Sequence, residues 1–377
     1  MLAQGDSRSS GLAWGLTLLR PQRLWLENKP LKYRSLSLRS ALLLNLYLKA
    51  IMKNSKLRLL SATLLACVLG LITAVSQAQN FPSKTIRVIE PAGPGSAVDT
   101  AVRDIIPALN EVFGQQVYID NKPGGNSLIG AREAIRAPAD GHTLFHGNIN
   151  NALNDLFPNT NCCRLGEALL PVTRIFSTPL VLVVNPAVPA KTLKEFLSLA
   201  KSQPELLTYA SGGNGSITQL LGELVKINAG VSIREVPYKA IGAELPDVLA
   251  GHVNAAYLAP VVVAQHIKSG KLRALGVAQS KRVSIVSDVP TFVEAGLANV
   301  EATGWNGIFV PAGTPGSVIN RIHADITKVL NSPASKAHGL EMGYEYGSDS
   351  PEEFGNFIKS EIKKWGGVMK DAKIKVE

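Results

Sequence analysis

Three glycine-rich segments hold the residue types best suited to binding a small anion. They span residues 91–99, 122–127 and 211–216, and each lies between an expected strand and an expected helix. Glycine has no side chain, so a ligand can approach its backbone N–H group directly. The start of a helix adds unpaired N–H groups and a partial positive charge. Together these features predict an anion-binding site that needs neither Lys nor Arg.

The same segments do not carry a catalytic motif. Gly93 and Gly95 resemble the start of a dinucleotide-binding fingerprint, but Val98 occupies the third glycine position. The third segment lacks the Lys of a phosphate-binding loop, and the chain contains no GxSxG motif. Ser211 and Ser216 have no His near them in the sequence that could act as a base. The pattern therefore favours a binding protein over an enzyme.

Closely spaced histidines and cysteines are the candidate metal ligands of the sequence. His142 and His146 are spaced to lie on one side of a strand, as a metal pair would be. No HExxH motif or third ligand accompanies them, so no metal site is predicted. Cys162 and Cys163 cannot form an ordinary disulfide, because that bridge needs well-separated Cα atoms. We interpret the pair as a local loop feature and expect neither a metal nor another cofactor.

Expected strands and helices alternate along most of the chain after residue 80. Two helices have the spacing of a capping box, at Thr192 with Glu195 and at Ser216 with Gln219. Strands separated by helices of about 10–15 residues predict parallel sheets with helices on both faces, whose ligands lie beyond the carboxyl ends of the strands. The expected strands are 86–90, 116–119, 143–146, 180–184, 206–210, 233–236, 253–257, 272–277 and 308–310, and the expected helices are 97–113, 128–136, 192–201, 216–228, 243–249, 261–268, 315–330 and 351–370.

The positive charge of the chain is concentrated near its N-terminus. The formal net charge is +10, from 39 Lys and Arg and 29 Asp and Glu. Residues 1–78 contain 11 of the basic residues but only two acids, which leaves 28 basic and 27 acidic residues in the remainder. The main body of the chain is therefore nearly neutral, and no nucleic-acid partner is expected.

Residues 52–78 have the organisation of a secretory signal peptide. Lys53, Lys56 and Arg58 precede an apolar run over residues 59–75, which is short for a membrane span. The small residues that follow it match a signal-peptidase cleavage site. Localisation in the periplasm is therefore expected.

Cleavage is expected after Ala78. Residues 1–51 are then interpreted as an over-extended start that is not part of the mature protein, with Met52 as the initiator. One alternative is a cytoplasmic tail before a membrane anchor. Another, weaker alternative is a lipoprotein anchored at Cys67.

Several short motifs follow the signal segment along residues 80–377. They are FPSKTIRVI at 81–89, PAGPGSAVD at 91–99, NKPGGN at 121–126, ADGHTL at 139–144, YASGGNGS at 209–216, VPYK at 236–239, GKLRAL at 270–275, DVPTFVEAG at 288–296 and PAGTP at 311–315. In their order and spacing they closely resemble the Bug family, the periplasmic receptors of tripartite tricarboxylate transporters. One departure is Gly95-Ser96, where the family usually has two glycines.

The resemblance implies an α/β fold of the two-lobed periplasmic-binding-protein type (type II-like). Such a fold has parallel-rich sheets with helices on both faces and a ligand cleft between lobes that close by a hinge motion. Lobe 1 is expected to comprise residues 79–183 and 306–377, and lobe 2 residues 184–305.

The resemblance also implies that loop backbone and small polar side chains hold a carboxylate, often through water. Asp99 then has two alternative roles, contact with a ligand ammonium group or capping of the helix through a backbone N–H group. Trp305 either contacts the ligand or packs at the hinge. The ligand-binding residues expected on this basis are Ser96, Asp99, Asn148, Asn150, Ser211, Gly212, Gly215, Ser216 and Trp305.

The expected function is a periplasmic solute receptor for a small carboxylate, such as a dicarboxylate or tricarboxylate. Its partners would be the membrane permease subunits of a tripartite transporter. Alternatively, the chain is a ligand-sensing module that docks on a membrane sensor kinase. The chain is expected to act as a monomer. The identity of the ligand does not follow from the sequence, because water-mediated contacts leave little trace in side-chain identity.

Overall fold

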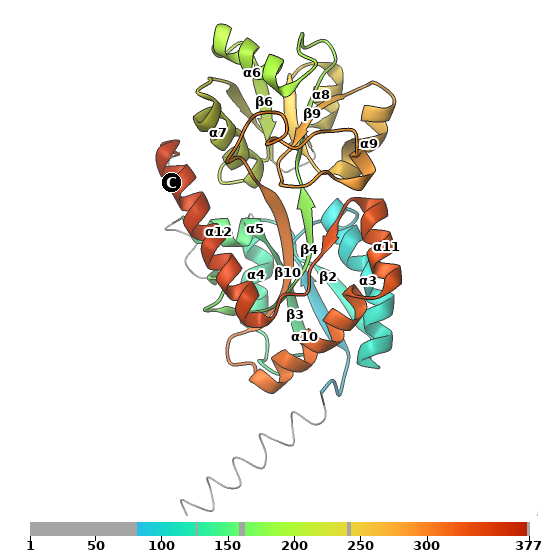
Figure 1. The fold of residues 1–377 in the computed structure, drawn as a ribbon. Coiled ribbons are helices and arrows are strands. Elements are labelled where there is room, and N and C mark those ends of the chain that lie inside the picture. Colours follow the sequence, from blue (N-terminus) through green and yellow to red (C-terminus); the bar gives the residue numbers. More distant parts are fainter. Residues whose placement is uncertain (1–80, 126, 158–162, 240–242, 375–377) are drawn as a thin grey trace, which may run out of the picture. The chain divides into compact units, whose positions relative to one another are not determined.

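A computed structural model of the chain describes residues 81–125, 127–157, 163–239 and 243–374 (Figure 1). The expected over-extended start, the signal peptide and Cys162 lie outside the described residues. Within the described part, no helix is long and apolar enough to cross a membrane. The described residues form two β-sheets, which we call the lobe-1 sheet and the lobe-2 sheet.

The lobe-1 sheet has six strands. They are β1 (Ile86–Glu90), β2 (Val117–Asn121), β3 (Thr143–Asn148), β4 (Leu169–Pro179), β10 (Thr303–Pro311) and β11 (Glu345–Tyr346). Their order across the sheet is β11-β4-β10-β3-β1-β2. β1 pairs in parallel with β2 and β3, whereas β10 runs antiparallel to β3 and β4. The strand order reverses between β1 and β3, so their carboxyl ends form the switch point where ligands of such sheets bind.

The lobe-2 sheet has five strands. They are β5 (Val181–Val184), β6 (Thr208–Ser211), β7 (Arg234–Pro237), β8 (Ala255–Leu258) and β9 (Arg273–Val277). The order is β7-β6-β8-β5-β9. β6 is parallel to β7 and β8, and β5 is antiparallel to β8 and β9.

Helices cover both sheets. In lobe 1 they are α3 (Ala97–Phe113), α4 (Leu128–Ile135), α5 (Ile149–Asn154), α10 (Gly316–Leu330), α11 (Pro333–Met342) and α12 (Pro351–Asp371). In lobe 2 they are α6 (Leu193–Ser202), α7 (Ile217–Ala229), α8 (Leu245–Ala250), α9 (Pro260–Lys268) and the short 3-10 helix η2 (Ser284–Val286). Local signals define their ends: α3 begins after the capping residue Ser96 and ends at Gly114, which has the left-handed φ of 63° that glycine adopts readily.

All the strands and helices expected from the sequence are present, but the sheets are mixed rather than parallel throughout. No local pattern predicts β4, which has no regular alternation of apolar residues and contains Pro171 and Pro179. Proline removes a ladder hydrogen bond and normally argues against an interior strand. Here β4 lies between β11 and β10, and both prolines still pair with residues of β10.

The chain crosses between the sheets twice, through two segments that are hydrogen bonded to each other. β4 continues through Leu180 into β5, and the β4–β10 ladder extends to the pair Pro179 and Thr303. Beyond it, the N–H of Ala278 donates to the carbonyl of Leu180 at 2.9 Å, and the N–H of Ala302 donates to the carbonyl of Ala278 at 2.8 Å. β4 and β10 run side by side at this crossing in Figure 1. The two crossings thus form a continuous ribbon.

Sheet membership shifts the expected lobe boundaries slightly. Residues 181–183 were expected in lobe 1, but they belong to β5 and pair with β8 and β9 of the lobe-2 sheet. Thr303 to Trp305 were expected in lobe 2, but they pair with β4 of the lobe-1 sheet. The chain therefore changes sheets at Leu180 and returns before Thr303.

Apolar side chains form three buried clusters. One lies under α3 and α10 on the lobe-1 sheet, and one lies under α8 and α9 on the lobe-2 sheet. The third contains side chains from both lobes, including Trp305 and Phe354 of lobe 1 and Tyr209 of lobe 2. α12 packs against β4, α5 and α7, so it contributes to this shared cluster on both sides of the crossing.

Gly307 on β10 provides a test of this packing. A methyl group there would lie 2.3 Å from Cζ of Phe354 and 3.0 Å from the carbonyl oxygen of Thr173, whereas Gly367 in α12 has open space around it. We predict that Gly307→Ala lowers the free energy of unfolding by about 1–3 kcal/mol through overpacking. Gly367→Ala should raise it by roughly 0.5–1 kcal/mol, because Ala favours a helix over Gly. Chemical denaturation of both variants measures the effects, and a shift of the same sign in both would contradict the packing described.

Candidate functional site

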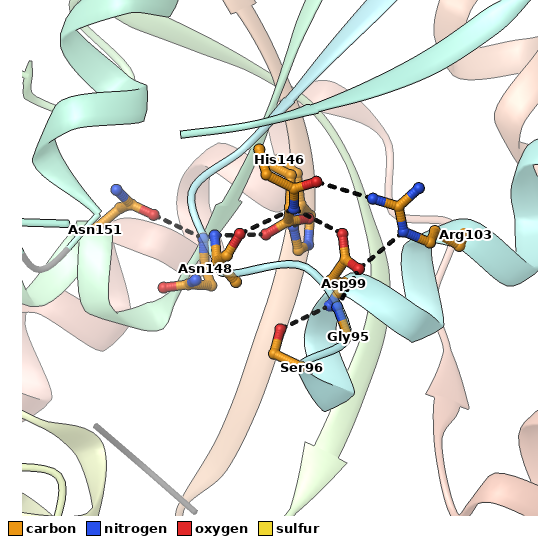
Figure 2. A network of polar contacts seen from close by, with 10 residues as sticks. Gly95, Ser96, Asp99, Arg103, His146, Asn148 and Asn151 are labelled. Carbon is orange, nitrogen blue, oxygen red and sulfur yellow. Dashed lines mark hydrogen bonds and ion pairs between the residues drawn. The ribbon is translucent and has the colours of Figure 1, made fainter. Parts of the chain in front are cut away.

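The carboxylate of Asp99, in the first turn of α3, holds the first glycine segment (Figure 2). Asp99 is fully buried. It accepts hydrogen bonds from the N–H of Gly95 at 2.8 Å, from Nε of Arg103 at 2.8 Å and from Nδ2 of Asn121 at 2.7 Å. The hydroxyl of Ser96 accepts from the N–H of Asp99 at 3.2 Å. Of its two expected roles, Asp99 makes the capping contact.

The surroundings of Asp99 favour its charged form. Burial by itself would raise the pKa of this carboxyl, but the hydrogen bonds from Arg103, Asn121 and Gly95 and the charge of Arg103 lower the pKa below its usual value of 3.8. Asp99 is therefore a carboxylate at neutral pH. Its folded-state contacts require that charge.

A second buried acid supports the same segment. Glu90 ends β1, and its Oε1 accepts from the N–H of Ala92 at 2.9 Å. Its Oε2 lies 2.6 Å from Nδ1 of His146 on β3, and both residues are fully buried. Glu90 thus connects the first glycine segment to His146, below the switch point between β1 and β3.

Both candidate histidines make hydrogen bonds within lobe 1. His146 is bonded to Glu90, and Nε2 of His142 accepts from the N–H of Ser83 at 3.1 Å. Among the described residues, no group of three His, Cys, Asp or Glu could hold a metal ion. Cys163 is buried.

Buried polar atoms without a protein partner gather at the carboxyl end of β3. Asn148 caps α5 through a bond from the N–H of Asn150 at 3.0 Å, and it pairs with Asn306 across the β3–β10 ladder. Within the described part of the chain, Oδ1 of Asn150, Oδ1 of Asn306 and Nε2 of His146 have no hydrogen-bond partner. Such atoms are rare because burying them unpaired is unfavourable. This end of the strand is therefore suited to a polar guest or to water.

The third glycine segment is held by side chains of its own lobe. Ser211 is fully buried and Ser216 is nearly so. Three glycine N–H groups of the segment donate to side-chain oxygens. The pairs are Gly212 with Oγ1 of Thr218 at 2.8 Å, Gly213 with Oγ of Ser211 at 3.1 Å, and Gly215 with Oε1 of Gln219 at 2.8 Å.

In the structure the N–H groups of Gly95, Gly212, Gly213 and Gly215 donate to side chains of the protein. Their hydrogens are used within the protein, because a short polar side chain two to six residues away reaches each of them. The loops are shaped before any ligand arrives. The positions of Ser96, Gly212, Gly215 and Ser216 as ligand contacts stay predictions.

Three helices begin with the same variant of the capping box. The Ser or Thr before the helix accepts from the N–H three residues on, as expected. The returning side chain, however, accepts from the residue before the cap rather than from the cap itself. These pairs are Asp99 with Gly95 in α3, Glu195 with Lys191 in α6 and Gln219 with Gly215 in α7. In α3 and α7 this bond fixes a glycine of the binding segments.

Gly215 brings the third segment against lobe 1. A Cβ atom at this position would lie 2.6 Å from Cζ of Phe157, which follows α5. Asn148 caps that same helix at the carboxyl end of β3. The segment formed by α5 and Phe157 therefore lies next to the switch point of lobe 1 at one end and next to the start of α7 in lobe 2 at the other.

Two other expected contributors lie elsewhere. Trp305 is fully buried and packs edge-to-face on Phe354 and Phe357, which matches the hinge-packing alternative, although its Nε1 has no hydrogen-bond partner. The second glycine segment follows β2, the edge strand of the lobe-1 sheet, and is linked to the first through Asn121. A cavity of about 560 Å³ in lobe 2, lined in part by Lys191 and Arg273, contains none of the expected site residues.

Sequence reasoning missed four residues that bond the glycine segments or their supports: Glu90, Arg103, Asn121 and Glu235, which accepts from the hydroxyl of Ser211. Arg103 had a usable signal, since it follows Asp99 by four residues in a helix. Glu90 had another, as the single acid in a strand that is otherwise mostly apolar. Asn121 and Glu235 act across sequence separations of 22 to 24 residues, and no local pattern marks them.

The described residues form two mixed β-sheets that are covered by helices and joined by a two-stranded crossing. Each sheet has a capped helix start at the carboxyl end of one of its strands. This arrangement is that of a two-lobed receptor of the periplasmic-binding-protein type. A solved structure described as that of a periplasmic transporter is 33% identical with a TM-score of 0.71, covering 79% of this chain and 100% of that one. The chain belongs to the tripartite tricarboxylate transporter receptor family, whose model matches residues 101–374.

Individual relatives agree with this assignment. The protein BugT of Bordetella pertussis is 30% identical over 327 residues, which is 84% of this chain and all of BugT. The structure of Rpa4515 from R. palustris with adipate is 28% identical with a TM-score of 0.72, covering 78% of this chain and 99% of that one. The structure of MatC from Rhodopseudomonas palustris with bound malate is 28% identical with a TM-score of 0.68, covering 76% and 99%.

The contacts of Asp99 predict a pH-dependent contribution to stability. Its pKa is lowered on folding, so its stabilisation is present above the unfolded pKa and is lost as the pH falls through the folded pKa. We expect Asp99→Asn to lower the free energy of unfolding by about 1.5–3 kcal/mol at pH 7 and by less at a pH below the usual pKa of 3.8. Glu111→Gln, at an exposed acid of the same helix, is the control. A loss from Asp99→Asn that is the same at both pH values would contradict the charged network.

Proposed function

We propose that the chain is a periplasmic receptor that binds a small dicarboxylate or tricarboxylate and delivers it to the membrane permease of a tripartite transporter. The observation that carries this proposal is the pair of capped helix starts, α3 and α7, at the carboxyl ends of β1 and β6. Among the described residues, polar atoms without a hydrogen-bond partner lie at the end of β3, next to β1 in the same sheet. Two relatives of the same family were solved with adipate and malate, and both ligands are dicarboxylates.

The first-turn N–H groups supply the donors for an anion in this proposal. The N–H groups of four loop glycines, Gly95, Gly212, Gly213 and Gly215, are used within the protein. The first-turn N–H groups left for a ligand are those of Ala97 and Val98 in α3 and of Ile217 and Thr218 in α7. A helix has no carbonyl of its own for these positions. The partial positive charge of the helix start favours a carboxylate there.

The polar atoms at the end of β3 complete the site. Oδ1 of Asn150 and Oδ1 of Asn306 accept hydrogen bonds, so they suit a hydroxyl group of the ligand or a water that bridges to its carboxylate. None of the groups in this region forms a nucleophile and base pair of the kind that acyl transfer needs. The ligand is therefore bound and released without chemical change.

Calorimetric titration tests the proposal. The purified protein is expected to bind one equivalent of a member of a panel that includes malate, adipate and citrate, and mass spectrometry should recover the ligand unchanged. Ser211→Ala combined with Ser216→Ala should weaken binding roughly tenfold or more, by removing hydrogen bonds that shape the start of α7.

A matched control separates the effect of loop shape on binding from any general effect of removing two serine hydroxyls. Ser202→Ala combined with Ser269→Ala removes two exposed hydroxyls that bond carbonyls at the ends of α6 and α9. This control should bind like the parent protein. Binding of no carboxylate by the folded parent, or turnover of the ligand, would refute the proposed function.

Export gives a separate prediction. In a Gram-negative host the protein should appear in the periplasmic fraction, with a mature N-terminus at Gln79 as expected for cleavage after Ala78. Edman sequencing of the fractionated protein measures this directly. Replacement of Ala78 by Arg should cause the uncleaved form to accumulate, because signal peptidase requires a small residue there. Recovery of the intact chain in the cytosol would contradict export.

A further inference from the structure

The carboxylate of Glu235 occupies a central position beneath the third glycine segment. Glu235 lies on β7, the edge strand next to β6, and pairs with Tyr209 in the parallel ladder. One of its oxygens accepts from the hydroxyl of Ser211, and the other accepts from Nε2 of Gln219 at 3.0 Å. Glu235 therefore joins the end of β6 to the first turn of α7.

Both partners of Glu235, Ser211 and Gln219, also accept hydrogen bonds from the glycine loop. The hydroxyl of Ser211 donates its hydrogen to Glu235 and accepts from the N–H of Gly213 at 3.1 Å. The side chain of Gln219 donates through Nε2 to Glu235 and accepts at Oε1 from the N–H of Gly215 at 2.8 Å. A single carboxylate thus orients two donors, and each of those donors fixes one glycine amide.

The loop needs such support because of its backbone. Gly213 and Gly215 have φ values of 89° and 74°, in the left-handed region, and a glycine loses much conformational freedom when it is held in one state. Without fixed acceptors, the loop would have many alternative conformations. The bonds from Ser211 and Gln219 select one of them.

We propose that Glu235 is the positioning residue of the lobe-2 binding loop and acts through Ser211 and Gln219. It orders the loop before binding and does not touch the ligand. Ser211 is on this basis a relay between Glu235 and Gly213 rather than a ligand contact. The proposal deepens the proposed function, on which its binding prediction rests.

The variant Glu235→Gln separates positioning from simple electrostatics. Gln is nearly isosteric but carries one acceptor oxygen in place of two, so it cannot accept from both Ser211 and Gln219 as Glu235 does. Removal of a negative charge near an anion should by itself tighten binding of malate or adipate. Positioning predicts the opposite sign, a loss of roughly tenfold in affinity.

Glu223→Gln is the matched control. Glu223 lies on the same helix, one turn beyond Gln219, and its bonds go to the hydroxyl of Tyr209 at 3.0 Å and to Nζ of Lys226 at 2.8 Å. It removes the same charge from the same side of the sheet without touching the loop. The affinity of the Glu223→Gln protein for malate or adipate should not fall.

Amide hydrogen exchange measured by NMR tests the proposal without any ligand. In Glu235→Gln, exchange at Gly213, at Gly215 or at both should accelerate roughly tenfold, while amides of β8 keep their protection. Ser211→Ala should accelerate Gly213 but not Gly215, and Gln219→Met should do the reverse. These two variants decide the question if Glu235→Gln fails to fold.

The outcomes separate this proposal from the proposed function. Unchanged exchange at both glycines in Glu235→Gln, or equal acceleration in Glu223→Gln, would overturn the positioning role. Unchanged or tighter binding by Glu235→Gln, in a parent protein that binds malate or adipate, would also overturn it. If the parent protein binds no carboxylate, the proposed function fails, and the exchange pattern alone decides whether Glu235 orders the loop.

Discussion

The amides of Gly95, Gly213 and Gly215 are oriented by hydrogen bonds to side chains of the protein, and these bonds set the shape of both binding loops. Glycine-rich segments are flexible in isolation, so a ligand that had to order them would lose affinity to the entropy of ordering. Here most of that ordering occurs on folding. Asp99 supplies the acceptor in lobe 1, and Ser211 and Gln219 supply it in lobe 2. The part of each loop proposed to meet a ligand is then a rigid helix start rather than a mobile turn.

This arrangement places carboxylates beneath a site proposed for carboxylates, and each acid is locally bonded. Asp99 forms an ion pair with Arg103, and Glu90 is hydrogen bonded to His146. Glu235 accepts from two neutral donors, Ser211 and Gln219. The field felt by an anion depends on the sum of these charges and of the helix dipoles, and short-range pairing limits the repulsion from each acid. The nearly neutral composition of the chain after residue 78 agrees with such pairing.

Much of the fold and part of the site could be predicted from the sequence because they depend on local patterns. The helix α3 was predicted with its observed ends, since Ser96 and Gly114 mark both of them. Strand direction was not predictable, because it depends on which strands become neighbours: β10 and β5 run antiparallel to their partners only because the chain crosses between sheets. The hydrogen bonds of the glycine N–H groups to protein side chains were not predictable either, because they also depend on which residues become neighbours. Composition shows that an N–H group is accessible, but only the packed structure shows that Thr218 or Gln219 already occupies it.

The double crossing between the sheets constrains how the lobes can move. Sliding one crossing strand past the other would disrupt the ladder in which Thr303 pairs with Pro179 and Gly304 with Thr178, and would break the bonds of Ala278 to Leu180 and Ala302. Bending both strands together breaks none of them, because the hydrogen bonds run across the ribbon rather than along it. Relative motion is thus restricted to flexure and twist of a two-stranded band, with the shared apolar cluster under α12 as its pivot. Mechanical stiffness of the molecule would then be set by a sheet-like element whose hydrogen bonds stay intact when it bends.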